Sequence, residues 1–228
     1  MPIVTKAVNA KPQSTLDVHV PAAILGATLS DELGLVGAKM AYARNEEIFG
    51  EGEPADYLYQ VVSGSVRCSR ILADGRRQIG AFYLPGDFFG LEIGDEHSSS
   101  CESMGATSVV VFKRSAVIER AKRDLNVARK LWEITTADLA RAQMHALQLI
   151  RSAEERVSSF LLAMASRSPN AAEFELPMSR QDIADHLGLT IETVSRSMTH
   201  FTDVGLIGLP CSRRVVLLKR SALERLNG

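Results

Sequence analysis

The sequence of 228 residues lacks most of the features that mark specialised classes of protein. Its three cysteines, Cys68, Cys101 and Cys211, are widely spaced, which argues against a disulfide framework or a thiolate zinc site and favours a reducing compartment. No run approaches the ~18–20 apolar residues of a membrane span, and no secretion signal opens the chain. Metalloprotease, nucleophile-elbow and phosphate-loop motifs are absent. These absences predict a cytoplasmic protein that is no enzyme and needs no metal or cofactor.

The chain also lacks an excess of either charge. Its 26 Lys and Arg residues balance 27 Asp and Glu residues, so the formal net charge is −1. Nucleic-acid-binding domains usually carry a clear basic excess. Residues 179–228 are slightly basic, with seven Lys and Arg against five Asp and Glu residues. The balance therefore predicts modest non-specific affinity for DNA and reliance on base contacts, rather than no DNA binding.

Glycine is missing between Gly105 and Gly188, whereas nine of the 16 glycines lie from Gly50 to Gly105. Because glycine punctuates tight turns, the glycine-rich region predicts short strands joined by hairpins. Asp74-Gly75 is one such hairpin signal. Short strands spaced by about 8–12 residues are typical of an antiparallel barrel or jelly roll.

The glycine-free region predicts a long helix from about Asp124 to Ile150. At 1.5 Å per residue it would run about 40 Å, so one face should pack on the barrel and another should meet a second copy of the chain. Two registers of this dimer seam are nearly equal, and a helix buried within one subunit is a further alternative. The first register contains Leu131, Ile134, Asp138, Arg141, His145 and Gln148, and the second contains Thr135, Ala142, Ala146 and Leu149.

Residues 179–196 predict a helix, a turn and a second helix. Ser179 and Asp182 fit a capping box at the start of the first helix. Gly188 lies where that helix should end in a left-handed residue, and Thr190 can cap the second helix. Apolar residues at helical spacing would hold the two helices together: Ile183, Leu187, Val194, Met198 and Phe201.

Four polar residues share one face of the second helix: Glu192, Ser195, Arg196 and Thr199. This face begins in the first turn, which is the end that a helix-turn-helix inserts into the major groove. Arg196 can donate two hydrogen bonds to guanine, and Glu192 can accept one from cytosine. The four are therefore predicted to read bases. The alternative is an exposed Glu192–Arg196 ion pair without a binding role.

A β-hairpin follows, with Arg213 and Arg214 at its turn. Basic side chains beside a recognition helix contact phosphates, which supply affinity and register. The residues predicted to contact the DNA backbone are Ser179, Arg180, Thr190, Thr193, Arg213 and Arg214. Cys211 beside these arginines is a candidate redox-active thiol, since positive charge lowers a thiol pKa; an unreactive cysteine is the alternative.

The order of these motifs resembles the cyclic-AMP receptor protein/fumarate–nitrate reduction regulator (CRP/FNR) superfamily over roughly residues 30–228. The matching segments are 49–56, 62–66, 84–90, 153–157 and 189–196. The resemblance implies an α+β fold. Its parts would be an N-terminal arm (1–29), a double-stranded β-helix of jelly-roll type (30–118), a dimerisation helix (119–152) and a winged helix-turn-helix (153–228).

The pattern of Glu192, Ser195 and Arg196 is similar to the oxygen-regulator branch, which reads TTGA half-sites in an inverted repeat. The segment 208–217 is similar to FixK-type regulators of microaerobic, nitrogen-fixation and denitrification genes. The resemblance implies a homodimer that binds double-stranded DNA and mostly activates transcription. It also implies a contact between RNA polymerase and the turn at Asp74, Gly75 and Arg76, for which a plain solvated turn is the alternative.

Two departures from the family concern the effector. No Arg follows residues 90–92 where the family neutralises a cyclic-nucleotide phosphate, and Arg141-Ala142 replaces adenine-contacting hydroxyls, so we expect no cyclic-AMP binding. Three cysteines are too few for a four-thiolate iron–sulfur cluster. His19, His97 and His145 are expected to be surface or packing histidines. A regulator gated by another small molecule is the alternative.

Overall fold

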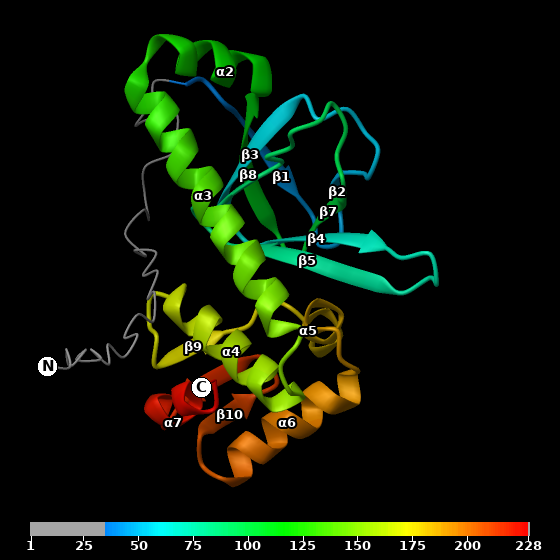
Figure 1. Cartoon of the computed structure of the whole chain (residues 1–228), viewed down its shortest axis with the longest axis vertical. Coiled ribbons are helices and arrows are strands. Elements are labelled where there is room, and N and C mark those ends of the chain that lie inside the picture. Colours follow the sequence, from blue (N-terminus) through cyan, green and yellow to red (C-terminus); the bar gives the residue numbers. More distant parts are fainter. Residues whose placement is uncertain (1–34, 228) are drawn as a thin grey trace, which may run out of the picture.

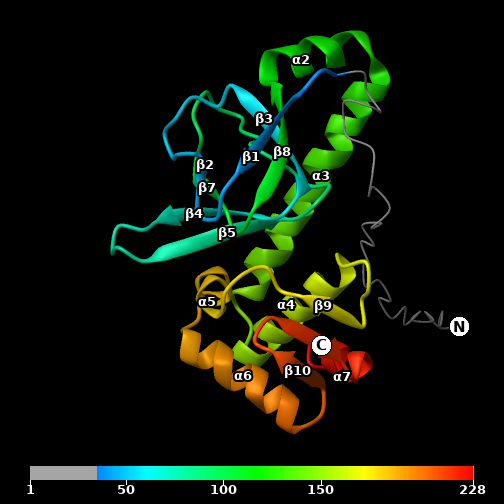
Figure 2. The same cartoon turned by 180° about the vertical axis from the view of Figure 1, so that it is seen from behind.

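The computed structural model describes residues 35–227, which form a β-domain, a long connecting helix and a smaller C-terminal domain (Figure 1). The predicted arm at residues 1–29 lies outside the described residues. The C-terminal domain lies below the β-domain in Figure 1, and the view from behind in Figure 2 shows the same two-tier arrangement.

Eight strands of the β-domain form two four-stranded antiparallel sheets, which confirms the predicted jelly roll. Inner-face side chains such as Phe49, Val66 and Phe89 are buried in the β-domain core. The first sheet has the order β1 (Ala38–Tyr42), β8 (Thr107–Lys113), β3 (Tyr57–Ser63) and β6 (Phe88–Phe89). The second has the order β2 (Glu47–Phe49), β7 (Ser100–Ser103), β4 (Val66–Ile71) and β5 (Arg77–Tyr83).

The hairpin of β4 and β5 extends past the rest of the β-domain (Figures 1 and 2). Its turn needs glycine, because Gly75 has a φ of +83°. The Asp74 carboxylate accepts hydrogen bonds from the backbone N–H of Arg76, at 3.1 Å, and from its side chain, at 2.7 Å. The Asp74-Gly75 signal for a hairpin is thereby confirmed.

Two of the three cysteines are paired across the second sheet. Cys68 of β4 and Cys101 of β7 are register partners and form a disulfide. The expectation drawn from their wide spacing is therefore wrong for this pair. Antiparallel pairing brings residues 33 positions apart opposite each other, and spacing alone does not reveal it. Cys211 is free and exposed.

The predicted long helix is α3 (Leu125–Gln148), which follows the shorter α2 (Arg114–Arg123). Asp124 separates the two helices, and its side chain caps α3 by accepting a hydrogen bond from the backbone N–H of Asn126. From there α3 runs along the β-domain and down to the C-terminal domain (Figure 1). No helix within residues 35–227 has the length and apolar character needed to cross a membrane.

The first register predicted for the dimer seam is the face of α3 that contacts its own subunit. Leu131 and Ile134 pack against the core of the β-domain. Arg141 pairs with Asp87 of the β-domain, and the His145 ring stacks on His186 of the C-terminal domain. This correction covers Leu131, Ile134, Asp138, Arg141, His145 and Gln148, all of which are half-buried. Arg141 and His145 have partners in other domains, which heptad spacing does not show, whereas Asp138 pairs with Arg141 within α3.

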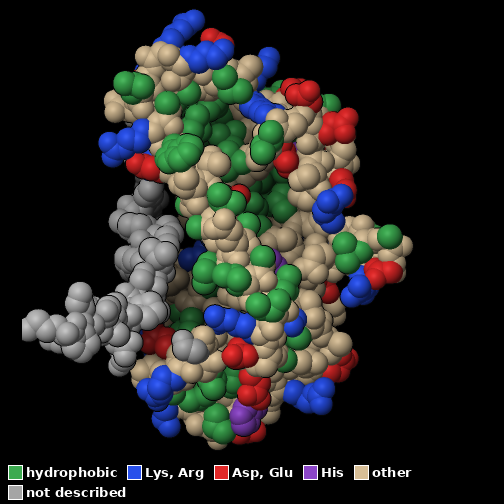
Figure 3. Space-filling view, viewed as in Figure 1, with side chains coloured by type: hydrophobic (Ala, Val, Ile, Leu, Met, Phe, Trp, Pro, Cys, Tyr) green, Lys and Arg blue, Asp and Glu red, His purple; other side chains and the backbone are tan. Residues whose placement is uncertain are grey.

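The opposite face of α3 is exposed and largely apolar. It carries Trp132, whose residue surface is 72% exposed, together with Leu139 and Leu147, and the exposed Ile150 follows in the turn after the helix. Figure 3 shows hydrophobic side chains along the path that α3 takes in Figure 1. The second predicted register, Thr135, Ala142, Ala146 and Leu149, lies on the exposed side of the helix.

The C-terminal domain contains four helices and a three-stranded sheet among the described residues. Its elements are α4 (Ala153–Ser166), β9 (Glu173–Glu175), α5 (Arg180–Leu187), α6 (Ile191–Asp203), β10 (Ile207–Cys211), β11 (Arg214–Leu217) and α7 (Arg220–Arg225), and the sheet order is β10-β11-β9. Ser152 and Glu155 form a capping box at the start of α4. The hairpin β10–β11 is the wing of a winged helix-turn-helix, as predicted.

Candidate nucleic-acid interface

The helix-turn-helix is built as its sequence predicts. The Ser179 side chain accepts a hydrogen bond from the backbone N–H of Asp182, whose carboxylate accepts one in return from the Ser179 backbone N–H. Gly188 ends α5 with a φ of +62°, and Thr190 caps α6 through the N–H of Thr193. The predicted apolar residues between the helices are all buried: Ile183, Leu187, Val194, Met198 and Phe201. Tight packing makes α5 and α6 one rigid unit.

All four residues predicted to read bases lie on the exposed face of α6: Glu192, Ser195, Arg196 and Thr199. Within residues 35–227, the side chains of Ser195 and Arg196 form no hydrogen bond or ion pair. The backbone N–H of Glu192 and the Thr190 hydroxyl lower the pKa of Glu192, and Arg196 adds to the shift. Glu192 is therefore ionised near neutral pH and able to accept a hydrogen bond from a base.

The residues predicted to contact the DNA backbone all have partners within the domain. The hydroxyls of Ser179, Thr190 and Thr193 act in the helix caps. Arg180 donates a hydrogen bond to the carbonyl of Ser212 in the wing turn, at 3.2 Å. Arg213 reaches the Pro177 carbonyl at 3.5 Å, and Arg214 pairs with Glu173 at 2.5 Å.

Surface arginines keep spare donors beyond such contacts, because a guanidinium carries five N–H groups. The Arg214 side chain remains 57% exposed. Phosphate contacts by Arg180, Arg213 and Arg214 therefore remain a prediction compatible with their positions.

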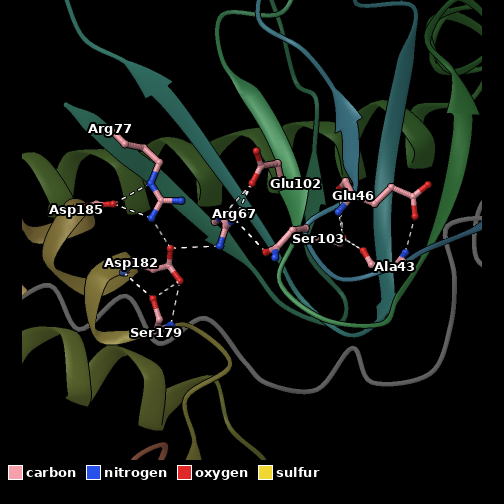
Figure 4. A network of polar contacts seen from close by, with 10 residues as sticks. Ala43, Glu46, Arg67, Arg77, Glu102, Ser103, Ser179, Asp182 and Asp185 are labelled. Atoms are coloured by element: carbon pink, nitrogen blue, oxygen red, sulfur yellow. Dashed lines mark hydrogen bonds and ion pairs between the residues drawn. The ribbon is translucent and has the colours of Figure 1, made fainter. Parts of the chain in front are cut away.

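A second polar cluster joins α5 to the β4–β5 hairpin, and sequence reasoning missed it (Figure 4). Arg67 of β4 and Arg77 of β5 both bind Asp182, and Arg77 also binds Asp185. These residues lie 105 to 115 positions apart in the chain. The only signal in the sequence was the presence of two carboxylates in a helix expected near DNA phosphates.

The protein families that the sequence matches agree with the geometry of the C-terminal domain. Residues 155–226 match the Crp-like helix-turn-helix domain, and residues 39–124 match the cyclic nucleotide-binding domain. The nitrogen fixation regulation protein FixK of Azorhizobium caulinodans is 50% identical over 84% of this chain and 80% of its own length.

The chain belongs to the CRP/FNR family. A further FixK protein, from Rhizobium meliloti, is 40% identical over 96% of this chain and 98% of its own length. The solved structure of FixK2 from Bradyrhizobium japonicum has 49% identity, covers 85% of this chain and 98% of its own, and superposes with a TM-score of 0.82. This member of the family is thus a FixK-like DNA-binding transcriptional regulator.

In the cyclic nucleotide-binding domain of this CRP/FNR protein, hydrogen bonds and ring stacking hold the loop that follows residues 90–92. The Arg114 guanidinium donates hydrogen bonds to the carbonyls of Glu92 and Gly94, each at 2.6 Å. His97 is 2% exposed and stacks on Phe49, with ring centroids 3.6 Å apart. His97 is therefore a packing residue, as expected. The loop after residues 90–92 obtains its order from Arg114 and from ring stacking.

The two remaining candidate sites are both exposed. Cys211 lies opposite Arg214 in the wing, at the end of β10. Asp74 and Arg76 form an ion pair with each other across the turn of the β4–β5 hairpin, at 2.7 Å. A redox role of Cys211 and a polymerase contact at residues 74–76 stay predictions.

Proposed function

We propose that the protein is a homodimeric, sequence-specific activator that binds TTGA-type palindromes. The observation that carries this proposal is the face of α6, where Glu192, Ser195, Arg196 and Thr199 are exposed in the first turns of the recognition helix. Arg196 has unused donors for guanine, and Glu192 has an ionised carboxylate for cytosine. We place the protein in the cytoplasm, where a regulator meets bacterial DNA.

The exposed apolar face of α3 supports the homodimer. Trp132, Leu139 and Leu147 would pack against the same residues of a second α3 in a symmetric contact. Two recognition helices placed in this way would enter successive major grooves about 34 Å apart. The inverted repeat of the proposed site reflects that symmetry.

The controlled genes are proposed to be those for microaerobic metabolism, nitrogen fixation or denitrification. Two relatives that cover most of this chain are named as nitrogen fixation regulation proteins. The transcriptional activatory protein AadR of Rhodopseudomonas palustris is also similar, at 38% identity over 86% of this chain. Activation would need RNA polymerase, for which the turn at Asp74, Gly75 and Arg76 is the proposed contact.

We further propose that DNA binding needs no added small molecule. The contacts of Arg114 with the loop carbonyls and the burial of His97 on Phe49 hold the loop through groups of the protein itself. A cyclic nucleotide would also need a cation beside its phosphate, and the segment 97–102 contains no Arg.

A binding titration of the purified, effector-free protein in air tests this function. The probes are a TTGA-N6-TCAA duplex and a duplex with scrambled half-sites. We expect a Kd of about 10⁻⁸ M or tighter at physiological salt, at least ~10³-fold tighter than on the scrambled duplex. Equal affinity for both duplexes would overturn the proposed site. Binding that appears only after a small molecule is added would favour the ligand-gated alternative.

A further inference from the structure

The face of α5 that points toward the β-domain is polar, although it is buried. Asp182, Asp185 and His186 stand at positions i, i+3 and i+4, so they share this face. All three contact the β4–β5 hairpin or α3 rather than solvent. Two carboxylates in the first helix of a helix-turn-helix would repel DNA phosphates if they faced the DNA. The fold instead turns them toward arginines of the β-domain.

Arg67 and Arg77 bind α5 at two carboxylates one helical turn apart, those of Asp182 and Asp185. We call these ionic contacts the clamp on α5. The Arg77 guanidinium donates to Asp182 Oδ1 at 2.7 Å and, through Nε, to Asp185 Oδ2 at 2.8 Å. Arg67 donates to the same oxygen of Asp182 at 3.3 Å. The Asp182 side chain is 6% exposed and that of Arg67 is 12% exposed, so solvent screens their interaction little.

Arg67 and Arg77 differ in what else they hold. Arg67 also donates to Glu102 at 2.7 Å and to Asn45 at 3.3 Å, so its position is set by the β-domain. Arg77 has only the two α5 carboxylates as side-chain partners among the described residues. Arg67 is therefore a fixed anchor, and Arg77 is the residue whose loss affects the contact with α5 alone.

A histidine pair stands beside this clamp. The His186 ring stacks on His145 of α3 with centroids 4.0 Å apart, and its Nδ1 lies 3.0 Å from the Ile79 carbonyl of β5. Gln78 donates a hydrogen bond to the His186 carbonyl at 3.2 Å. These contacts add α3 and the backbone of β5 to the surfaces that hold α5.

A second ionic contact holds the other side of the junction. Asp87, in the turn before β6, binds Arg141 of α3 at 3.2 Å and pairs with Arg167 at the end of α4. The β-domain, α3 and the C-terminal domain are thus linked at two separate places. The apolar core is continuous across the junction, because Ile79 and Phe82 of the β-domain pack with Phe160 of α4.

We propose that Arg67 and Arg77 are positioning residues for DNA binding, which fix the orientation of α5 on the β-domain and thereby the spacing of the two α6 helices in the dimer. The inference rests on the proposed homodimer and palindrome. The only covalent link from α3 to α4 is the short segment 149–152, which does not set an orientation by itself. Because α5 and α6 are one unit, a clamp on α5 also orients α6.

The clamped arrangement is the one that binds DNA. The recognition residues of α6 are exposed in it, and α6 itself lies on the side of the C-terminal domain away from the β4–β5 hairpin (Figures 1 and 2). Weakening the clamp lets each C-terminal domain sample other orientations. The effective concentration of the second α6 at its half-site then falls, while the contacts of one α6 with one half-site stay intact.

The test is a double-mutant cycle with Arg77→Ala, Asp185→Ala and the double variant. Asp185 is chosen because Asp182 also serves the capping box of α5. A matched control cycle uses Arg70→Ala and Glu51→Ala, an ion pair of β4 that stays within the β-domain. Each protein is titrated on palindromes with spacers of four, six and eight base pairs and on a duplex with one half-site. A spacer change of two base pairs rotates one half-site by about 70° and moves it by about 7 Å.

We expect Arg77→Ala and Asp185→Ala each to weaken binding to the six-base-pair palindrome by about ten- to hundredfold. The double variant should be no worse than Arg77→Ala, because Arg77→Ala already removes the contact with Asp185. Preference for the six-base-pair spacer should shrink by a similar factor, while affinity for a single half-site stays within about twofold. The Arg70 and Glu51 variants should match the wild type.

Unchanged affinity and unchanged spacer preference in the Arg77 and Asp185 variants would overturn the positioning role, and so would tighter binding to the palindrome. Loss of half-site binding in parallel with palindrome binding would also overturn it, since that result indicates damage to the helix-turn-helix. Asp185→Asn, which keeps the side-chain volume, provides a second variant if Asp185→Ala unfolds. Failure of the wild type to prefer any palindrome would contradict the proposed function instead.

Discussion

The helix-turn-helix has two polar faces that differ in how their side chains are used. On α6, Ser195 and Arg196 are exposed, and within residues 35–227 their side chains have no hydrogen-bond or ion-pair partner. On the inward face of α5, Asp182 and Asp185 are largely buried and bound by arginines. Polar side chains with free donors and acceptors are available to a ligand, whereas satisfied ones maintain the fold.

This difference also explains how a nearly neutral protein can bind DNA. Two of the five acidic residues in 179–228, Asp182 and Asp185, are paired with Arg67 and Arg77 of the β-domain. Their charges are neutralised locally and point away from the recognition face. The formal net charge includes these two carboxylates, although the fold holds both of them away from the face that would contact DNA.

The largest expected effect on stability comes from removing a carboxylate from the inward face of α5. Asp182→Ala should lower the free energy of unfolding by about 3–5 kcal/mol, because it leaves Arg67 and Arg77 short of a buried partner and removes the cap of α5. Denaturant titration measures this. Glu192→Ala on the exposed face is the control and should change stability by less than about 0.5 kcal/mol. Equal effects of the two substitutions would erase the proposed difference between the faces.

The recognition face should respond in the opposite way. Arg196→Ala should cost about 1–3 kcal/mol of binding free energy per half-site and relax specificity at the guanine, while leaving the melting temperature nearly unchanged. Titrations on the palindrome and on random DNA measure the effect. An equal loss on both DNAs would show that Arg196 contacts phosphate rather than a base.

The inward face should also be sensitive to acid. Burial, with the neighbouring His145 and Arg167, lowers the pKa of His186 to about 3, although its bond to the Ile79 carbonyl opposes the shift. Unfolding exposes a histidine with a pKa near 6.5, so the unfolded chain binds the proton first. The stability of the junction is therefore full above about pH 6.5 and falls by up to ~1.4 kcal/mol per pH unit as pH drops toward 3.

Urea titrations of the wild type and of His186→Gln between pH 5 and 7 measure this contribution. The variant should be less stable at pH 7 but should lose less stability on acidification. Parallel pH profiles for the two proteins would show that His186 does not cause the acid sensitivity.

The smallest expected effect is at the wing. Arg213→Ala and Arg214→Ala should each weaken binding to all DNA sequences alike and reduce the slope of log affinity against log salt by about one. Affinities at several salt concentrations give this slope. A loss confined to the palindrome would assign the wing a role in reading sequence.

Local features of the fold could be predicted from the sequence because they depend on neighbouring residues. The capping box of Ser179, the left-handed Gly188 and the shared face of Glu192 and Arg196 all follow from spacing within one or two helical turns. The same spacing predicts that all four base-reading residues share one side of α6, and all four are exposed there.

Features that join distant segments could not be predicted from spacing. The two faces of α3 have similar heptad patterns, and only contacts with distant segments, such as that of Arg141 with Asp87 and that of His145 with His186, show which one faces inward. The Cys68–Cys101 disulfide depends on the register of two strands. The clamp on α5 joins side chains more than 100 positions apart, so it emerges only when both domains are in place.

The most direct test of the recognition face combines a protein variant with a DNA variant. Wild type and Arg196→Ala are titrated on the palindrome with guanine or with 7-deazaguanine, which lacks the N7 acceptor, in each TTGA half-site. Base reading by Arg196 predicts that 7-deazaguanine weakens the wild type by about five- to hundredfold and leaves Arg196→Ala unchanged. An equal loss in both proteins, or no loss in the wild type, would contradict it.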